Sequence, residues 1–157
     1  QVSDGAATSS QTFTINVTNV APTTPTDSNS AANSVLQGAA NGTAVGITAS
    51  ATDVNGGTVT YSLADDAGGR FAINATTGVV TVADGTLLDY QTATSHTITV
   101  QASDGTDTST QTFTINVTNM PPGTPDDSDN AANSVVEGAA NGTAVGVTAA
   151  EPNGLPN

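Results

Sequence analysis

The residues of this sequence that could support catalysis are few. The single histidine, His96, lies in the alternating stretch HTITVQA, and the chain has no cysteine that could act beside it. Serine and aspartate are frequent, yet no glycine motif at a sharp turn after a strand presents a serine as a nucleophile. We therefore expect no enzymatic activity, and we expect His96 to be an exposed residue at the end of a strand.

Charged side chains also gather in the segment DDAGGR, which contains Asp65, Asp66 and Arg70. This group could suggest a binding pocket, but the segment is more typical of a hairpin loop. A local ion pair in such a loop contributes little to stability. The other aspartates and asparagines also occur where turns are expected, and there their side chains accept hydrogen bonds from nearby backbone N–H groups.

The chain is strongly acidic. Its 157 residues carry 14 acidic side chains against one basic residue other than histidine, which gives a formal net charge of −13. This charge argues against nucleic acid as a partner, because such binding depends on lysine and arginine meeting phosphates. It also argues against adsorption to an anionic membrane, and no apolar run approaches the ~20 residues of a membrane-spanning helix.

The chain repeats itself with a period of one hundred residues. Residues 1–50 and 101–150 are identical at 36 of 50 aligned positions, and both copies contain the stretch QTFTINVTN. This period is the length of a domain. We predict the C-terminal strands of a preceding repeat at 1–19, one complete repeat at 20–119, and the N-terminal strands of a following repeat at 120–157. Both partial repeats lack the middle strands found at 58–82, which indicates a longer parent polypeptide, and the terminal EPNGLPN at 151–157 departs from the repeat.

Apolar and polar residues alternate through most of the repeat, which is the pattern of half-buried antiparallel strands. Turn signals such as Asn-Gly-Gly and Asp-Gly separate the alternating runs. About seven strands in a hundred residues predict an all-β, seven-stranded Greek-key β-sandwich of the immunoglobulin-like kind, in tandem copies. The residues expected to face inward are Val45, Ile47, Ala49, Val59, Tyr61, Leu63, Phe71, Ile73, Val80, Val82, Ile98, Val100, Ala102, Phe113, Ile115 and Val117.

Several short motifs occur in a fixed order along the complete repeat. They are GTAVGITASATD at 42–53, TVTYSLADDAGGRFAINATTGVVTV at 58–82, LLDYQ at 87–91, VQASDG at 100–105 and INVTNMPP at 115–122. In this order and spacing the repeat resembles the cadherin repeat family, and specifically its bacterial branch in long repetitive surface proteins. The resemblance spans the whole complete repeat.

The resemblance implies calcium ions at the junctions between repeats, held by loop and linker oxygens. The residues implied at the upper end of the complete repeat are Asp53, Asn55 and Asp104, with Asn16 and Asn19 from the incoming linker. Those implied at the lower end are Asp89, Gln91 and Gln37, with Asn116 and Asn119 from the outgoing linker. A junction held in this way is stiff.

The sequence departs from the family pattern at these positions. Gln37 and Gln91 stand where the family has glutamate, and linker aspartates are replaced by asparagines such as Asn19 and Asn119. The following repeat keeps a carboxylate, Glu137, at the position of Gln37. Because calcium affinity depends on the number of anionic ligands, we expect weak sites with dissociation constants of ~10⁻⁴ to 10⁻³ M, or none.

These observations predict a spacer or stalk repeat of a large secreted bacterial adhesin, with neighbouring repeats as its partners. Tandem β-domains, acidity and the lack of cysteine favour an extracellular or cell-surface location. The segment APTTPTDSNSAANS at 21–34 is expected to be an extended, partly stiff linker. An alternative hypothesis is a subunit of an extracellular filament, in which strands from other copies of the chain complete the partial repeats. Surface adhesion would need exposed aromatic residues, and of Phe13, Tyr61, Phe71, Tyr90 and Phe113 only Tyr90 is expected to be free.

Overall fold

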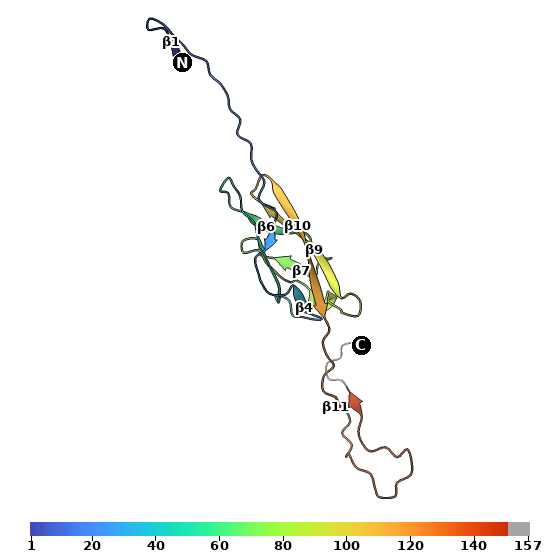
Figure 1. Cartoon of the computed structure of the whole chain (residues 1–157). Coiled ribbons are helices and arrows are strands. Elements are labelled where there is room, and N and C mark those ends of the chain that lie inside the picture. The colour runs from blue at the N-terminus through green and yellow to red at the C-terminus, as the bar shows by residue number, and fades with distance from the viewer. Residues whose placement is uncertain (151–157) are drawn as a thin grey trace.

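The computed structural model describes residues 1–150, and its centre is a sandwich of two four-stranded sheets (Figure 1). The first sheet has the order β4 (Ser34–Leu36), β10 (Thr108–Thr118), β9 (Ser95–Ser103) and β6 (Thr60–Asp65). The second sheet has the order β3 (Thr26–Asp27), β5 (Ala44–Ser50), β8 (Val79–Val82) and β7 (Phe71–Ile73). Neighbouring strands are antiparallel except for the parallel pair β4–β10. The predicted all-β sandwich is confirmed.

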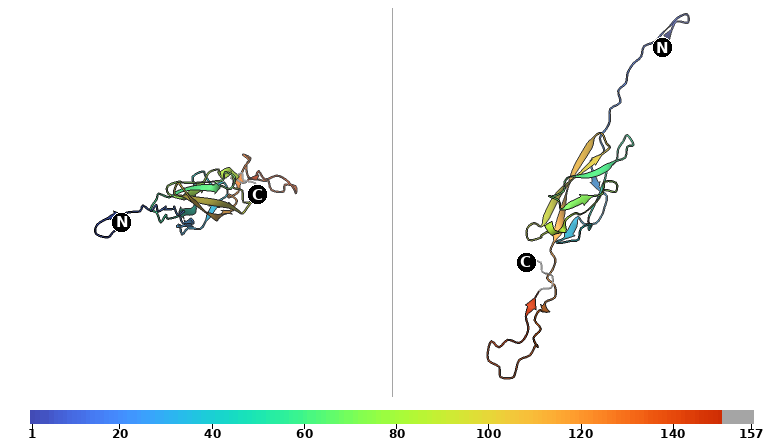
Figure 2. Two further views of the ribbon diagram at one scale, coloured as in Figure 1. Left: turned by 90° about the horizontal axis from the view of Figure 1, so that it is seen from above. Right: turned by 180° about the vertical axis from the view of Figure 1, so that it is seen from behind.

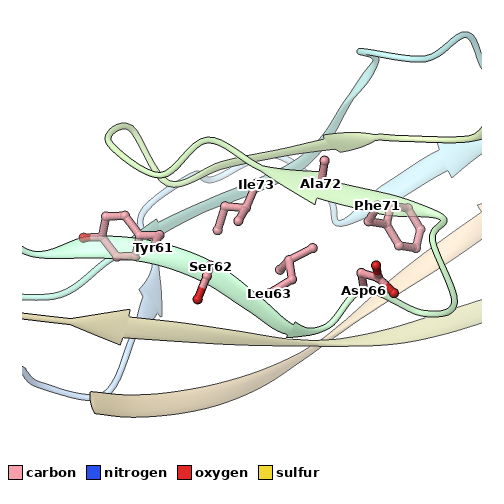
Figure 3. Close-up of a pocket in the computed structure, with 7 residues that line it drawn as sticks. All are labelled: Tyr61, Ser62, Leu63, Asp66, Phe71, Ala72 and Ile73. Carbon is pink, nitrogen blue, oxygen red and sulfur yellow. The ribbon is translucent and has the colours of Figure 1, made fainter. Parts of the chain in front are cut away.

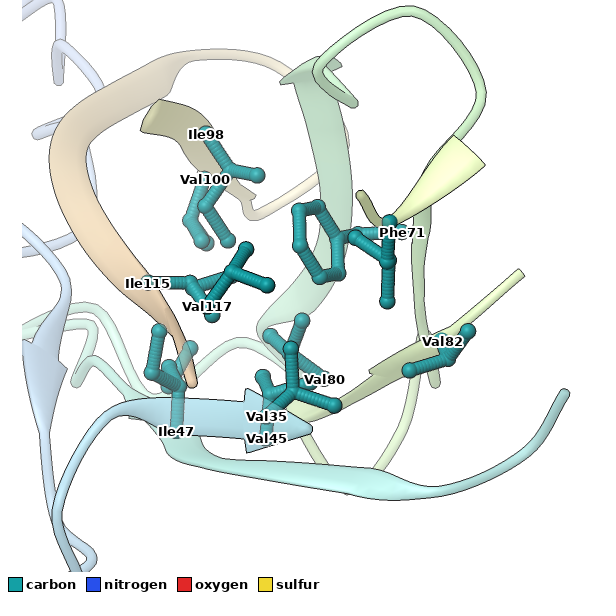
Figure 4. Packing of buried hydrophobic residues seen from close by; sticks show 12 residues of the cluster. Val35, Val45, Ile47, Phe71, Val80, Val82, Ile98, Val100, Ile115 and Val117 are labelled. Atoms are coloured by element: carbon teal, nitrogen blue, oxygen red, sulfur yellow. The ribbon is translucent and has the colours of Figure 1, made fainter. Parts of the chain in front are cut away.

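The core lies between the sheets, where apolar side chains from both layers point toward one another (Figure 4). Its fully buried members include Ile47 on β5, Val80 on β8, and Ile98 and Ile115 on the facing sheet. Burial of such a side chain stabilises the fold by about 1.5–3 kcal/mol. Most residues predicted to face inward are buried. Tyr61, Leu63, Ile73 and Phe113 are only partly buried and pack against this core. Val59 is also only partly buried.

The first strand of the repeat is split between the two sheets. β3 pairs with β5 in the second sheet, and β4 then pairs with β10 in the first. This arrangement corrects the prediction of a partly stiff linker at 21–34, because Pro22 and Pro25 are buried. Backbone hydrogen bonds from Thr23 N to Thr52 O (2.8 Å) and from Ser28 N to Thr48 O (2.9 Å) hold the segment against β5. The prolines are part of the packing at the edge of the sandwich.

A glycine-dependent bulge bends β5. The register between β5 and β8 shifts between Ala44 and Thr48, and Gly46 in this interval has a φ of +87°. A Cβ atom at Gly46 would lie 2.2 Å from the carbonyl oxygen of Ala32. The following copy has the same arrangement, since a Cβ at Gly146 would lie 2.3 Å from the oxygen of Ala132. Only glycine allows the chain before β4 to approach β5 this closely.

The segments that flank the sandwich contain only short strand pairs among the described residues. β1 (Val2–Ser3) pairs with β2 (Thr8–Ser9), and β11 (Asp126–Asp127) pairs with β12 (Ala149–Ala150). The two segments leave the sandwich at opposite ends (Figures 1 and 2). The sandwich itself has one short 3₁₀ turn, η1 (Gly85–Leu87), in its described part. The predicted departure from the repeat at 151–157 lies outside the described residues.

Identical sequences have opposite environments in the two copies of QTFTINVTN. In β10, Ile115 is 0% and Val117 is 2% exposed, whereas the matching Ile15 and Val17 are 86% and 90% exposed. Residues 11–19 form no strand, and Phe13, which we expected to face inward, is 81% exposed. The alternating pattern becomes a buried strand only where a second sheet covers it.

Candidate functional site

The upper end of the sandwich, where the chain enters, joins an amide to two carboxylates. Asn19 donates hydrogen bonds from its side-chain nitrogen Nδ2 to Oδ2 of Asp104 (2.7 Å) and to Oδ2 of Asp107 (2.9 Å). Asp104 and Asp107 occupy the turn between β9 and β10, so the contact joins residues 85 and 88 positions apart. The sequence predicted Asn19 and Asp104 at one junction, and the structure brings them together.

Asp107 belongs to this group although the family resemblance did not imply it. The first copy has alanine at the matching position, Ala7, so the aspartate is a difference between the copies. This difference between the copies could have pointed to Asp107, because the surrounding turn residues are otherwise similar. The carboxylate of Asp107 is exposed apart from its bond to Asn19.

Asp53 and Asn55 form the neighbouring loop of the upper end. The two carboxylate oxygens of Asp53 accept hydrogen bonds from the backbone N–H groups of Asn55 (2.8 Å) and Gly57 (3.3 Å). Oδ1 of Asn55 accepts a hydrogen bond from the backbone N–H of Val20 (3.2 Å). The incoming chain therefore touches this loop as well as the β9–β10 turn. Asn16, the remaining residue predicted here, is exposed in the extended segment before the junction.

Hydrogen bonding lowers the pKa of the Asp104 carboxyl below its ordinary value. The side-chain amide of Asn19 is the largest cause, and the backbone N–H groups of Asp107 and Thr106 add to it. All three donors stabilise the ionised carboxylate. Asp104 is thus held as an anion by the segment that enters the sandwich.

The lower end of the sandwich is centred on Gln37. This residue is 6% exposed, and its Oε1 accepts a hydrogen bond from the backbone N–H of Tyr90 (3.2 Å). Its own backbone N–H donates to the carbonyl oxygen of Thr118 at the end of β10 (3.0 Å). Gln37 therefore connects the end of β4, the end of β10 and the LLDYQ loop, and it acts as a structural bridge.

Asp89 closes the turn within that loop. Its carboxylate accepts hydrogen bonds from the backbone N–H of Gln91 (2.9 Å) and from Oγ1 of Thr92 (2.5 Å). The Thr92 hydroxyl, followed by the Gln91 N–H, lowers the pKa of Asp89. The other residues predicted at this end are exposed and are not gathered around Asp89. They are Gln91, Asn116, Asn119 and, in the following copy, Glu137.

His96 is not the exposed residue that the sequence predicted. It follows the inward phase of β9, is half-buried, and lies with its ring 6.3 Å from that of Phe71. Its Nε2 is buried without a hydrogen-bond partner. Burial first, and then the positive charge of Arg70, lower the pKa of His96. Within residues 1–150, no carboxylate or hydroxyl is hydrogen-bonded to this Nε2, so the paired acid–base arrangement of general acid–base catalysis is not seen there.

The segment DDAGGR is a loop, but it is held by bonds different from those predicted. Arg70 donates from Nη1 to the carbonyl oxygen of Ala67 (2.7 Å) and from Nε to that of Leu87 (3.0 Å). The aspartates accept backbone bonds, for example Asp66 Oδ1 from Gly69 N (2.8 Å). The guanidinium group thus holds two carbonyl oxygens in place of the expected ion pair.

A shallow groove of about 300 Å³ lies between β6 and β7, the edge strands of the two sheets (Figure 3). It is lined by Tyr61, Ser62, Leu63, Asp66, Phe71, Ala72 and Ile73. Asp66 is its only acidic side chain, and that carboxylate is occupied by the loop bond to Gly69. The groove offers no combination of acid, base and nucleophile. Tyr90, expected to be free at the surface, instead packs against the core.

The complete repeat matches a known protein family. A model described as "Cadherin domain" matches residues 33–118, which is more than half of the chain. The chain belongs to the cadherin domain family. Domains of this family are extracellular adhesion modules rather than enzymes, and they generally bind calcium. No match to this cadherin chain is found among curated proteins.

Solved cadherin structures share the fold of this cadherin chain. Human protocadherin-24 EC1-2 is 21% identical with a TM-score of 0.53, covering 86% of this chain and 61% of that one. Drosophila N-cadherin EC1-3 is 19% identical with a TM-score of 0.51, covering 65% and 35%. The protocadherin gamma B2 extracellular domains 1–5 are 26% identical with a TM-score of 0.50, covering 73% and 23%. This chain therefore spans less than two thirds of each of these fragments, all of which contain two or more cadherin domains.

The upper end of this cadherin domain, as arranged here, does not fit a calcium ion. Calcium takes six to eight oxygen ligands, whereas the atom facing Asp104 and Asp107 is an amide nitrogen that donates hydrogen. Each carboxylate oxygen of Asp53 accepts a hydrogen bond from a backbone N–H group. Within residues 1–150, no three histidine, cysteine, aspartate or glutamate side chains are grouped to hold a metal. Within the same residues, no helix has the length and apolar character needed to cross a membrane.

Proposed function

We propose that this chain is a spacer segment of a large secreted bacterial surface adhesin, built from cadherin domains joined end to end. The observation that carries the proposal is the path of the chain through the sandwich. Asn19 contacts the turn that precedes β10, and the outgoing chain leaves where β10 ends at Thr118. Entry and exit therefore lie at opposite ends of the longest strand (Figure 1).

The length of β10 sets the reach of each repeat. This strand has 11 residues, and at ~3.3 Å per residue it extends about 36 Å. Repeats joined through opposite ends add their lengths, so an array would hold a terminal binding domain far from the cell surface. The sandwich needs no catalytic group for this role.

The flanking segments are proposed to be parts of neighbouring repeats. The exposed Ile15 and Val17 repeat the buried Ile115 and Val117, and the sheet missing around them would come from a preceding domain. In the same way, residues 120–157 would begin a following domain. The proposed borders are thus 1–19, 20–119 and 120–157.

A filament assembled by strand exchange is the second candidate. The exposed apolar row of Phe13, Ile15 and Val17 favours it, because strands from another copy of the chain could cover this row as well as a preceding domain could. Light scattering and electron microscopy of the purified chain distinguish the two functions. A monomer at all accessible concentrations supports the spacer, and fibres support the filament.

Small-angle X-ray scattering on tandem proteins tests the spacer function. Proteins with two and four directly joined copies of residues 20–119 should differ in maximum dimension by at least about 60 Å, close to two strand lengths of ~36 Å. A compact four-copy protein whose dimension barely exceeds that of two copies would contradict the proposal. A single copy serves as the reference for both.

A further inference from the structure

The contact between Asn19 and the β9–β10 turn is unusual in its chemistry. One neutral side-chain nitrogen donates to two carboxylates, at 2.7 Å and 2.9 Å. An amide NH₂ group has two hydrogens, so both bonds use its full donor capacity. Hydrogen bonds to ionised acceptors are about twice as strong as those between neutral groups.

The orientation of this amide follows from the charges around it. If Asn19 were turned to present Oδ1, its oxygen would face the negative oxygens of Asp104 and Asp107 with no hydrogen between them. A donor at this position also separates two carboxylates that would otherwise repel each other. The amide thus serves the electrostatic purpose of a cation while remaining part of the chain.

Residues that follow Asn19 also form hydrogen bonds with the sandwich. The backbone N–H of Val20 donates to Asn55, and the carbonyl oxygen of Thr23 accepts a hydrogen bond from Oγ of Ser109 (2.8 Å). Thr23 Oγ1 also accepts from the backbone N–H of Thr52 (2.9 Å). Together these bonds join the incoming segment to both sheets.

We propose that Asn19 is a latch that fastens the incoming segment to the cadherin domain without a metal ion. This inference rests on the proposed spacer function. It adds that the junction would be stiff at any calcium concentration. Asn119 occupies the matching position before the next repeat, within the same stretch QTFTINVTN. In a longer array, such an asparagine would fasten the next domain wherever that domain carries both turn aspartates; the first copy, with Ala7 in place of Asp107, carries only Asp4.

The chain contains an internal control for the latch. Asn19 and Asn119 end identical nine-residue stretches, but within residues 1–150 only Asn19 has acidic partners for its side chain. Nuclear magnetic resonance of the full chain in EDTA can compare hydrogen exchange of the two side-chain NH₂ groups. We expect exchange at Asn19 to be at least about tenfold slower, as a charge-assisted hydrogen bond requires. Equal exchange rates at the two residues would overturn the latch.

Replacing Asn19 with aspartate distinguishes a metal-free latch from a calcium site. Asn19→Asp removes both donors and adds a third negative charge, so its junction resonances should shift in EDTA and respond to added calcium. The native chain should show no response to calcium at submillimolar concentrations. Asn119→Asp makes the same chemical change without acidic partners and should leave the junction resonances of the sandwich unchanged.

Two results would contradict the inference. One is a native chain whose Asn19, Asp104 and Asp107 resonances move together on submillimolar calcium. The other is an Asn19→Ala variant whose residues 19–23 keep native chemical shifts and exchange rates. Neither result bears on whether repeats are joined end to end, which the scattering of tandem proteins measures separately.

Discussion

The hydroxyl oxygen of Tyr61 accepts a hydrogen bond of 2.9 Å from the backbone N–H of Ala51. Tyr61 belongs to β6 in the first sheet, and Ala51 directly follows β5 in the second. This bond therefore connects the two layers at the place where the chain passes from one to the other. It also satisfies a backbone donor that neither sheet can pair.

Replacing this hydroxyl tests its contribution. Tyr61→Phe should lower the free energy of unfolding by about 1–2 kcal/mol, because the N–H of Ala51 would lose its partner. Urea denaturation measures the change. Tyr90→Phe is the matched control, since within residues 1–150 the Tyr90 hydroxyl makes no comparable bond and its loss should cost less than about 0.5 kcal/mol. Equal effects of the two variants would contradict the role of the inter-sheet bond.

The bulge at Gly46 predicts a position-dependent effect of alanine. Gly46→Ala would place a Cβ atom 2.2 Å from the oxygen of Ala32, so the backbone must move, at a cost of about 3 kcal/mol or more. Gly56→Ala is the control, because Gly56 also has a positive φ (+79°) but open space around the new atom. Strain in φ alone should cost about 1 kcal/mol there. Thermal unfolding of both variants would reveal the difference, and similar losses would count against the close approach.

His96 predicts a loss of stability in mild acid. Its pKa is lowered from the ordinary value of 6.5 by burial and by Arg70, so the unfolded chain takes up a proton before the folded one. The stability that neutral His96 contributes is complete above that value and is lost as the pH falls from it toward the folded pKa. Melting temperatures between pH 7.5 and pH 5 should decline in the native chain. They should decline less in His96→Gln, and parallel curves would show that another group is responsible.

Much of the fold could be predicted from local sequence, and the repeat shows which part. The hydrogen bond from Thr48 N to Oδ1 of Asp27 (3.0 Å) has an identical counterpart from Thr148 N to Asp127 (3.0 Å). The second copy lacks a surrounding sandwich in the described residues, yet it keeps this bond. Local sequence is therefore sufficient for the β3–β5 pairing.

Other features depend on partners that are distant in the sequence. The stretch QTFTINVTN is a buried strand at 111–119 and an exposed extended segment at 11–19, so the alternating pattern alone did not determine its structure. The bonds from Asn19 reach residues more than eighty positions away, and local motifs give no measure of such proximity. The family resemblance placed Asn19 and Asp104 at one junction, but it implied a cation between them rather than a direct bond.

Two wrong predictions had signals that could have been used. His96 is in phase with Ile98 and Val100 along β9, so the alternation itself indicated an inward position. Pro22 and Pro25 were interpreted as linker residues because of their composition. Both are buried just before the edge strand β3, where a proline is tolerated because no further strand needs its N–H.

A stiff junction between repeats would hold adjacent domains at one distance, and that distance can be measured across a single junction. The native chain has no cysteine, so two introduced cysteines can carry spin labels on adjacent domains of a protein with two joined copies of residues 20–119. In that protein Asn119 of the first copy takes the position of Asn19. A latch that needs no metal ion should give one narrow distance distribution, the same in EDTA and in millimolar calcium. A broad distribution in EDTA that narrows when calcium is added would contradict it.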